Sequence, residues 1–225
     1  LITHWKEYFP NHKYDTNYGL SESTGPGCAH LGMENIHKVG AIGVPGYRWV
    51  AKICDDRGEE VPDGEVGELW VKGPGVMVCY YNNPEASNDS IKNGWLLTGD
   101  MARKDEDGFI WLVDRKKDVV ISGGENIYPV QIEDHISAHP AVKDVAVIGL
   151  PDERLGEIAA AVEAKPDAGL TEAELEEHCQ ALPRYKRPRK YIFAPVPRNA
   201  TGKIEKPKLR QIYGATNIVE LENEG

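Results

Sequence analysis

The charged run DRKKD, residues 114–118, separates two stretches of the sequence whose hydrophobic patterns differ. Before it, between residues 39 and 113, short β-rich runs alternate with Asp, Gly and Pro turn signals, a pattern that predicts antiparallel strands in a small β-barrel. After it, helical and strand patterns alternate. We therefore predict a mixed α/β and α+β fold, with one domain over residues 1–114 and a second over residues 115–225.

The second domain is predicted from two helical patterns and three strand patterns. In YPVQIEDHISAHP, Pro129 suits a first helical turn, and Ile132 and Ile136 share one face. In TEAELEEHCQALP, Thr171 and Glu174 have the spacing of a capping box. The apolar runs DVAVIGL, EIAAAVEA and KYIFAP have the length of strands. Together they predict a compact α+β domain.

Composition excludes several classes of protein. The net charge of −10 argues against binding of nucleic acid or of an anionic lipid surface. The four cysteines are widely spaced, which favours reduced thiols over a disulfide or zinc framework. The sequence has neither an apolar run of transmembrane length nor a secretory leader. We expect a cytoplasmic protein without a transmembrane segment.

The hexapeptide NYGLSE, residues 17–22, offers groups that suit a nucleotide. Tyr18 has a flat face for a purine and Ser21 has a hydroxyl for a phosphate oxygen. Glu22 has the hard carboxylate oxygen that Mg²⁺ prefers. Taken alone, a tight turn at Tyr18 and Gly19 before a helix cap explains the hexapeptide better.

Two further segments carry candidate binding groups. In GWLLTGD, Asp100 follows a glycine at a strand end, where a carboxylate can accept hydrogen bonds from both ribose hydroxyls. In DRKKDVVISGGENIYP, Arg115 has a fixed fork of donors, and Gly123 and Gly124 allow a narrow ligand to approach the backbone. A strand-terminating turn, a charged linker and a glycine hairpin are the alternatives.

The octapeptide NATGKIEK, residues 199–206, places Lys203 directly after turn-forming residues. A lysine is a compact point charge that suits two anions which must approach one another. For an isolated TGK, a surface lysine after a tight turn is the better explanation.

These four segments, in this order, resemble the adenylate-forming superfamily: acyl-CoA synthetases, firefly luciferase and the adenylation domains of peptide synthetases. GELWVKGPGVMVCYYNNPE and RYKRPRKYIFAPVPRNATGKIEK agree with that family, and the resemblance covers nearly the whole chain. It implies that a carboxylic acid attacks the α-phosphate of ATP to form acyl-AMP, which a thiol, usually coenzyme A, then cleaves. The cofactors and co-substrates implied are ATP, Mg²⁺ and coenzyme A.

The resemblance also implies a role for each motif residue. Tyr18 would stack on adenine beside Gly19, Ser21 would touch phosphate, and Glu22 would ligate Mg²⁺. Asp100 would hold the ribose hydroxyls with the help of Arg115. Lys203 would be catalytic, bridging the acid carboxylate and the α-phosphate.

In the family the small C-terminal domain rotates between the two half-reactions. Lys117 would occupy the hinge. Gly123, Gly124 and Glu125 would line the entry for the pantetheine arm of coenzyme A. The first part of the chain would then be the end of a large adenylation domain with its small barrel, and the second part the mobile domain.

One element of the family is absent from the sequence, namely the Ser/Thr/Gly-rich loop that ends in Lys and holds the β- and γ-phosphates. The chain also begins at Leu1. We therefore expect the C-terminal fragment of an AMP-forming ligase for a fatty or aryl acid, of the long- or medium-chain fatty acid type, whose partner is the missing N-terminal part. A non-catalytic truncated product, half of a split enzyme and an unrelated binding module are the alternatives.

Overall fold

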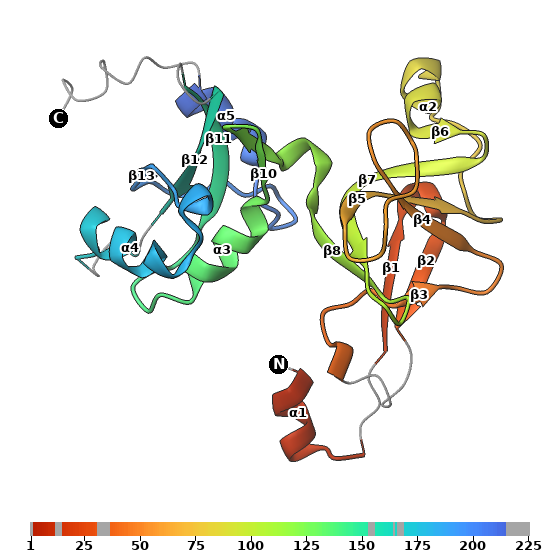
Figure 1. The fold of residues 1–225 in the computed structure, drawn as a ribbon, viewed down its shortest axis with the longest axis horizontal. Helices are drawn as coiled ribbons and strands as arrows, with labels where there is room; N and C mark the ends of the chain where they lie inside the picture. Colours follow the sequence, from red (N-terminus) through yellow and green to blue (C-terminus); the bar gives the residue numbers. More distant parts are fainter. Residues whose placement is uncertain are drawn as a thin grey trace. The chain divides into compact units, whose positions relative to one another are not determined.

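The computed structural model describes residues 2–11, 15–30, 37–152, 156–163, 165 and 169–214. Contacts divide the chain into two compact units, Leu1–Lys116 and Lys117–Gly225. Figure 1 shows the first unit in red to yellow-green and the second in green to blue. The two are described separately below as the first unit and the second unit.

The first unit contains two antiparallel sheets. A three-stranded sheet has the order β1-β2-β3, and a five-stranded sheet has the order β4-β5-β7-β6 with β8 also paired to β7. Closure of these strands into a barrel stays a prediction. The elements are α1 (Ile2–Tyr8), β1 (Thr16–Leu20), η1 (Ser21–Ser23), β2 (Gly25–His30), β3 (Val44–Pro45), β4 (Val50–Cys54), β5 (Val66–Lys72), α2 (Pro84–Ser90), β6 (Ile91–Lys92), β7 (Trp95–Lys104) and β8 (Ile110–Arg115).

The long strand β7 positions the candidate site of this unit. Its burial alternates along the strand, so that Leu96, Thr98, Asp100 and Ala102 face the interior. Leu96 and Ala102 belong to a hydrophobic cluster that also contains Tyr18 of β1 and Leu69 of β5. The same alternation therefore points the side chain of Asp100 inward, where it is buried.

The second unit is built on one mixed sheet. Its strands run in the order β10-β9-β12-β11, and β13 pairs in parallel with β12. The elements are η3 (Lys116–Asp118, which begins one residue before the unit), β9 (Val120–Ser122), β10 (Glu125–Ile127), α3 (Pro129–Ser137), β11 (Ala146–Asp152), β12 (Gly156–Val162), α4 (Glu172–His178), η4 (Cys179–Ala181), η5 (Arg184–Lys186), β13 (Lys190–Ile192) and α5 (Lys206–Gly214).

Helices cover both faces of this sheet, as the packing of β11 shows. Val147 lies in a cluster with Ile132 of α3 and Leu175 of α4. Its neighbour Ile148 lies in a second cluster with Leu209 of α5. Because successive strand residues point to opposite faces, α5 packs on the face opposite α3 and α4 (Figure 1).

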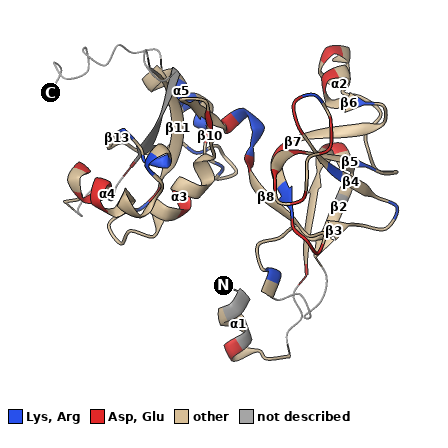
Figure 2. Ribbon diagram, viewed as in Figure 1, with Lys and Arg blue, Asp and Glu red and all other residues tan. Residues whose placement is uncertain are grey.

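The local signals in the sequence are found where they were predicted. Pro129 stands at the first turn of α3. Thr171 caps α4, its side chain accepting from the Glu174 amide while Glu174 reaches back to the Thr171 amide. Figure 2 shows the acidic residues on α4, next to its positive N-terminal end. All three predicted runs form strands, although residue 164, at the end of EIAAAVEA, lies outside the described residues.

The helices in the described part of the chain are all too short or too polar to span a lipid bilayer.

Candidate functional site

Asp100, Arg115 and Tyr18 meet in the first unit. Asp100 and Arg115 face each other across the β7–β8 pair, and Arg115 Nε lies 2.9 Å from Asp100 Oδ1. The hydroxyl of Tyr18 donates to Asp100 Oδ2 over 2.5 Å. The structure thus joins Tyr18 of NYGLSE to Asp100 of GWLLTGD and Arg115 of DRKKDVVISGGENIYP. Each oxygen of the carboxylate already has one donor.

Burial shapes the protonation of this cluster. Asp100 is 5% exposed, and its pKa lies above the ordinary value because burial and the nearby charge of Glu68 raise it by more than the Tyr18 hydrogen bond and the Arg115 charge lower it. The pKa of the Tyr18 hydroxyl is raised by burial and by its bond to Asp100. Tyr18 therefore acts as the donor to Asp100.

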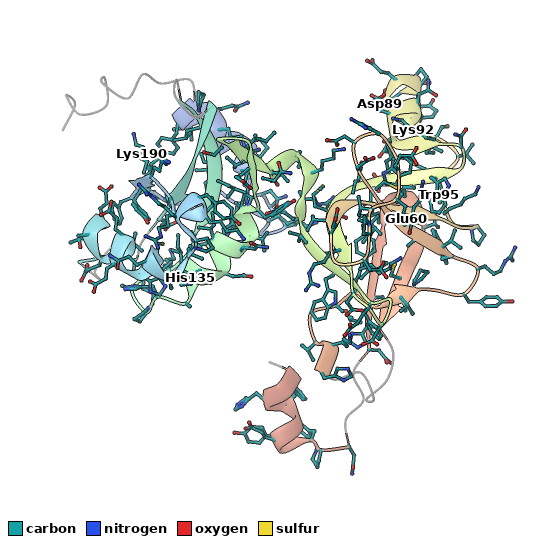
Figure 3. The ribbon with its side chains drawn as sticks, in the orientation of Figure 1. Glu60, Asp89, Lys92, Trp95, His135 and Lys190 are labelled. Atoms are coloured by element: carbon teal, nitrogen blue, oxygen red, sulfur yellow. The ribbon has the colours of Figure 1, made fainter. Side chains whose placement is uncertain are left out.

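A cleft of about 480 Å³ opens beside this cluster. Its volume lies within the range of small-molecule sites. Among its lining residues are Glu22, Glu68, Tyr80, Asp89, Gly99, Arg115 and Lys116. Asp89 is labelled on α2 in Figure 3. The cleft therefore brings together cationic groups from β8 and η3 and anionic groups from η1, β5 and α2.

Ser21 and Glu22 lie on the short turn η1 directly after β1. Ser21 is exposed, and Glu22 is half-buried at the cleft, where its Oε1 accepts a hydrogen bond from Tyr80 over 2.7 Å. Gly19 follows a register shift in the β1–β2 pair and is exposed. Tyr18 is 8% exposed and packs in the core, so its stacking on a purine stays a prediction.

Glu22 is the predicted magnesium ligand. In the described ranges no three or more His, Cys, Asp or Glu side chains gather in a group that could hold a metal ion by themselves. Mg²⁺ at nucleotide sites takes one or two carboxylates and completes its shell with phosphate oxygens and water. Glu22, a carboxylate at the wall of the cleft, fits that requirement.

Several residues of this region were missed by the sequence reasoning. Glu68 is 7% exposed; its Oε1 accepts from the Gly99 amide over 3.1 Å and its Oε2 from Lys116 Nζ over 3.2 Å. Lys116 also reaches Asp56 at 2.8 Å. Tyr80 holds Glu22. Glu68 lies in GELWVKG, a segment typical of a strand, and Lys116 lies in the charged run DRKKD, so neither residue is marked as a site residue by its neighbours.

Lys203 lies in the second unit, on a turn held by the side chain of Asn199. Asn199 Oδ1 accepts hydrogen bonds from the amides of Thr201 and Lys203, at 3.0 and 2.9 Å. Gly202 has φ = 82°, a left-handed conformation that suits glycine. Lys203 itself is exposed, and its Nζ makes no hydrogen bond or ion pair with the described residues. The fold fixes the backbone and leaves the ammonium group available.

Arg198 ties this turn to the rest of the unit. Its guanidinium donates to Asp144 Oδ2 through Nε at 2.8 Å and through a terminal nitrogen at 2.6 Å. The other terminal nitrogen donates to the Gly202 carbonyl over 2.6 Å. Arg198 therefore connects the turn that carries Lys203 to the loop before β11.

Gly123 and Gly124 form the two-residue turn of the β9–β10 hairpin. Their φ angles are 60° and 86°, and Ser122 pairs with Glu125 across the turn. A turn with positive φ at both central positions favours glycine at each. A Cβ at Gly124 would meet nothing within 4 Å, so its backbone is open to an approaching group. Glu125 and Lys117 are exposed as well.

The predicted site residues thus fall into two sets. The first unit brings together Tyr18, Asp100 and Arg115, and places Glu22 at the same cleft as Arg115. Lys117, the glycine hairpin and Lys203 belong to the second unit. Their roles toward ligands stay predictions.

Two sequence profiles match the chain. That of the AMP-binding enzyme covers residues 1–81, and that of the AMP-binding enzyme C-terminal domain covers residues 131–203. A long-chain-fatty-acid–CoA ligase of Mycobacterium tuberculosis is 44% identical over 201 residues, which cover 88% of this chain and 40% of that protein. A 2-succinylbenzoate–CoA ligase of Bacillus cereus is 41% identical over 197 residues, covering 87% of this chain and 40% of that protein.

Solved structures agree with these relatives. The ATP-bound MatB of Rhodopseudomonas palustris is similar with a TM-score of 0.82 and 34% identity, over 91% of this chain and 41% of that one. The o-succinylbenzoate CoA synthetase of Bacillus subtilis, in complex with its acyl-adenylate intermediate, has a TM-score of 0.83 and 34% identity, over 93% and 43%. This chain spans about two fifths of the curated relatives it matches. With both profiles matched and the fold shared, the chain belongs to the adenylate-forming family of AMP-binding enzymes.

Proposed function

We propose that this chain is part of an ATP-dependent acid:thiol ligase, which activates a carboxylic acid as acyl-AMP and transfers the acyl group to coenzyme A. The observation that carries the proposal is the cluster of Tyr18, Asp100 and Arg115, in which Arg115 lines a cleft of about 480 Å³, in a chain that is 44% identical to a CoA ligase over 201 residues. In this proposal the Asp100 carboxylate accepts hydrogen bonds from the ribose hydroxyls and Arg115 supports it.

Adenylation requires a carboxylate to approach a phosphate that is already anionic. A cation between the two lowers that repulsion most when it is fixed in advance, because no reorganisation is then needed. Lys203 meets this condition, since Asn199 and Arg198 hold its turn and its ammonium group is unpaired in the described structure. We assign it the bridging role between the acid and the α-phosphate.

Mg²⁺ would be held by Glu22 together with phosphate oxygens, and it would supply charge neutralisation on the phosphates. Tyr80 orients the Glu22 carboxylate through its hydroxyl. Ser21, exposed beside Glu22, would donate to a phosphate oxygen. Gly19 and the Tyr18 ring would border the adenine.

The thiol step would use the second set of residues. Gly123 and Gly124 would let the pantetheine arm pass close to the backbone, with Glu125 beside it. The contact boundary between Lys116 and Lys117 supports Lys117 as the hinge at which the second unit turns. The units before and after it would be the end of a large adenylation domain and a small mobile domain.

For the acid we propose a long- or medium-chain fatty acid, which the 44% identity to a long-chain-fatty-acid–CoA ligase supports. The relative that acts on 2-succinylbenzoate, at 41% identity, supports an aryl acid as the second candidate. A place in fatty acid metabolism and a cytoplasmic location belong to the same proposal.

The proposal is tested by acid-dependent ATP–pyrophosphate exchange with the 225-residue chain, across short, medium, long and aryl acids. AMP binding, measured by calorimetry, reports independently on the nucleotide site. Exchange that depends on one acid class would identify the substrate, and would show that this chain contains a sufficient site. AMP binding without exchange would support a folded but incomplete site that needs a separate N-terminal half.

A matched pair of lysines tests the assignment of Lys203. Lys203→Ala should abolish exchange and leave AMP binding unchanged. Lys208→Ala is the control, because it removes another exposed lysine, five residues further along the chain, whose partner is Glu205 at 2.5 Å. Equal exchange by the wild type and the Lys203→Ala variant would remove Lys203 from the mechanism.

The hinge has its own test. Lys117→Pro fixes φ near −65° and restricts the residue before it. It should spare acyl-AMP formation and slow thioester formation. An equal loss in both half-reactions would contradict the hinge.

The second candidate function is a non-catalytic chain that only binds nucleotide weakly, or acts in association with a separate N-terminal half. It rests on the span of the match, which is about two fifths of the curated relatives. It predicts AMP binding without exchange, and recovery of exchange when the missing half is supplied.

A further inference from the structure

Asp100 lies on an irregular segment of β7. In the β5–β7 ladder, Glu68 pairs with Met101 and Trp70 pairs with Leu97, so residues 98–100 lie opposite Leu69 alone. Such a bulge changes the direction of the side chains that it carries, and bulges are common next to active sites. It also removes the ladder partners of the backbone amides within it.

Side chains replace those ladder bonds. The Asp100 amide donates to Thr98 Oγ1 over 3.1 Å, and the Thr98 hydroxyl donates to the Leu69 carbonyl over 2.7 Å. The Gly99 amide donates to Glu68 Oε1 over 3.1 Å. Because a buried amide without an acceptor is costly, these acceptors select the conformation of the bulge. Gly99, with φ = 70°, adopts a backbone that glycine permits.

The other oxygen of Glu68 binds the lysine that follows β8. Oε2 accepts from Lys116 Nζ over 3.2 Å and from Trp70 Nε1 over 3.3 Å. Lys116 is the residue after Arg115. One buried carboxylate therefore holds the residue before Asp100 through its backbone and the residue after Arg115 through its side chain. Gly99 and Lys116 both line the cleft, as does Arg115.

We propose that Glu68 is a positioning residue for the Asp100–Arg115 pair, fixing the bulge and the end of β8 so that the carboxylate is pre-set to receive ribose hydroxyls. The ribose part rests on the proposed function. The backbone part, that Glu68 holds the Gly99 amide, stands independently of any ligand. The experiment separates the two.

The variants are Glu68→Ala, Glu68→Gln and the control Glu60→Gln. Glutamine keeps a carbonyl acceptor for the Gly99 amide, whereas alanine removes it. Glu60, labelled in Figure 3, lies between β4 and β5 with its side chain 52% exposed, and its charge partner is Lys104 at 3.6 Å. Hydrogen exchange at the Gly99 and Asp100 amides is measured by NMR, and binding of AMP and of 2′,3′-dideoxy-AMP by calorimetry.

In Glu68→Ala we expect exchange at Gly99 to be about tenfold faster, and AMP to bind about fivefold more weakly, as loss of one net hydrogen bond implies. Glu68→Gln should restore slow exchange, and Glu60→Gln should match the wild type. Dideoxy-AMP should bind the wild type and Glu68→Ala equally, because it has no ribose hydroxyls to hold. If Glu68 had only a structural role, Glu68→Ala would weaken the binding of both nucleotides equally.

Unchanged exchange at Gly99 in Glu68→Ala would overturn the proposal. Equal weakening of AMP and dideoxy-AMP would overturn the ribose part and leave Glu68 as a structural residue. If the wild type binds AMP and dideoxy-AMP equally, the ribose assignment of the proposed function fails, while faster exchange at Gly99 would still support the backbone part. Should Glu68→Ala not fold, Thr98→Val tests the same bulge at the Asp100 amide.

Discussion

The hydroxyl of Tyr18 donates to Asp100 Oδ2 over 2.5 Å, although the two residues lie 82 positions apart in the sequence. Arg115 donates to the other oxygen. Each carboxylate oxygen can accept about two hydrogen bonds, so both retain capacity for a further donor. Tyr18 and Arg115 thus orient Asp100, and the Tyr18 hydroxyl contributes to this cluster while its ring packs in the core.

Tyr18→Phe removes that hydroxyl and keeps the ring. Because the Tyr18 hydrogen bond lowers the pKa of Asp100, the variant should raise the pKa of Asp100 further above its ordinary value. The free energy of unfolding of the first unit should fall by about 1 kcal/mol. NMR titration of Asp100 and urea unfolding measure these effects. Tyr47→Phe, at a ring that is 93% exposed, is the control; an unchanged Asp100 titration in Tyr18→Phe would contradict the hydrogen bond.

Asp105 should make the first unit sensitive to acid. Burial raises its pKa, but hydrogen bonds from Lys38, from the Trp111 indole and from the Phe109 amide outweigh burial and lower the pKa to about 2. A depressed pKa stabilises the fold above the unfolded-state value of 3.8 and loses that contribution as the pH falls toward 2. Asp105→Asn should therefore cost about 2 kcal/mol at pH 7 and almost nothing near pH 2.

The measurement is urea unfolding followed by tryptophan fluorescence. All five tryptophans lie at or before residue 111, so their emission reports on the first unit alone. Asp63→Asn, at a side chain that is 53% exposed and paired with Lys104, should change stability by less than about 1 kcal/mol. A constant difference between the wild type and Asp105→Asn from pH 7 to pH 2 would refute the linkage.

Asn199→Ala should loosen the turn that carries Lys203 without unfolding the second unit. The variant removes the acceptor of the Thr201 and Lys203 amides. Exchange of these amides should accelerate by about tenfold while the thermal midpoint changes little, since the turn is exposed. Asn199→Asp keeps the acceptor and should restore slow exchange. Equal exchange in the wild type and Asn199→Ala would show that Arg198 alone holds the turn.

Lys206 and Glu133 join the start of α5 to α3. Lys206 Nζ lies 2.7 Å from Glu133 Oε1, with side chains 11% and 16% exposed. Glu133 also accepts from the Val147 amide of β11 over 2.7 Å. Lys206→Met should destabilise the second unit by about 3 kcal/mol, because it removes the cation that faces a largely buried carboxylate.

Far-UV circular dichroism during urea unfolding follows that loss, since the longer helices of the second unit contribute most of the helical signal. The double variant Lys206→Met with Glu133→Gln retains an acceptor for Val147 and removes the negative charge that Lys206 faced. It should be more stable than Lys206→Met alone. Additive losses in the double variant would show that the two side chains do not interact.

Much of the fold could be predicted because its signals are local. Pro129 and the Thr171–Glu174 box act within a few residues of chain, and each appears in the structure as the pattern indicated. Asp100 was predicted at a strand end but lies in the middle of β7, because the strand continues past the glycine to Lys104. Tyr18, Asp100 and Arg115 could be named from motifs because those signals are local as well. What motifs could not give was the direction of their side chains.

Glu68 shows why the rest was missed. In GELWVKG it reads as one polar residue of a strand, and nothing nearby marks it. Its function depends on a register irregularity between β5 and β7, and on Lys116, which lies 48 residues further on. Register is set by the packing of whole strands, so a short segment does not contain it.

The sequence by itself determined the helix caps, the order of the motifs and the glycine turn at residues 123 and 124, because each depends on neighbours in the chain. Tertiary structure decided that Tyr18 and Arg115 both bind Asp100, and that Glu68 acts behind them. It also decided that Arg198 connects the Lys203 turn to Asp144, 54 residues away. Such contacts form only when distant strands and loops are packed together, and they determine which side chains are held and which, like Lys203, are left available.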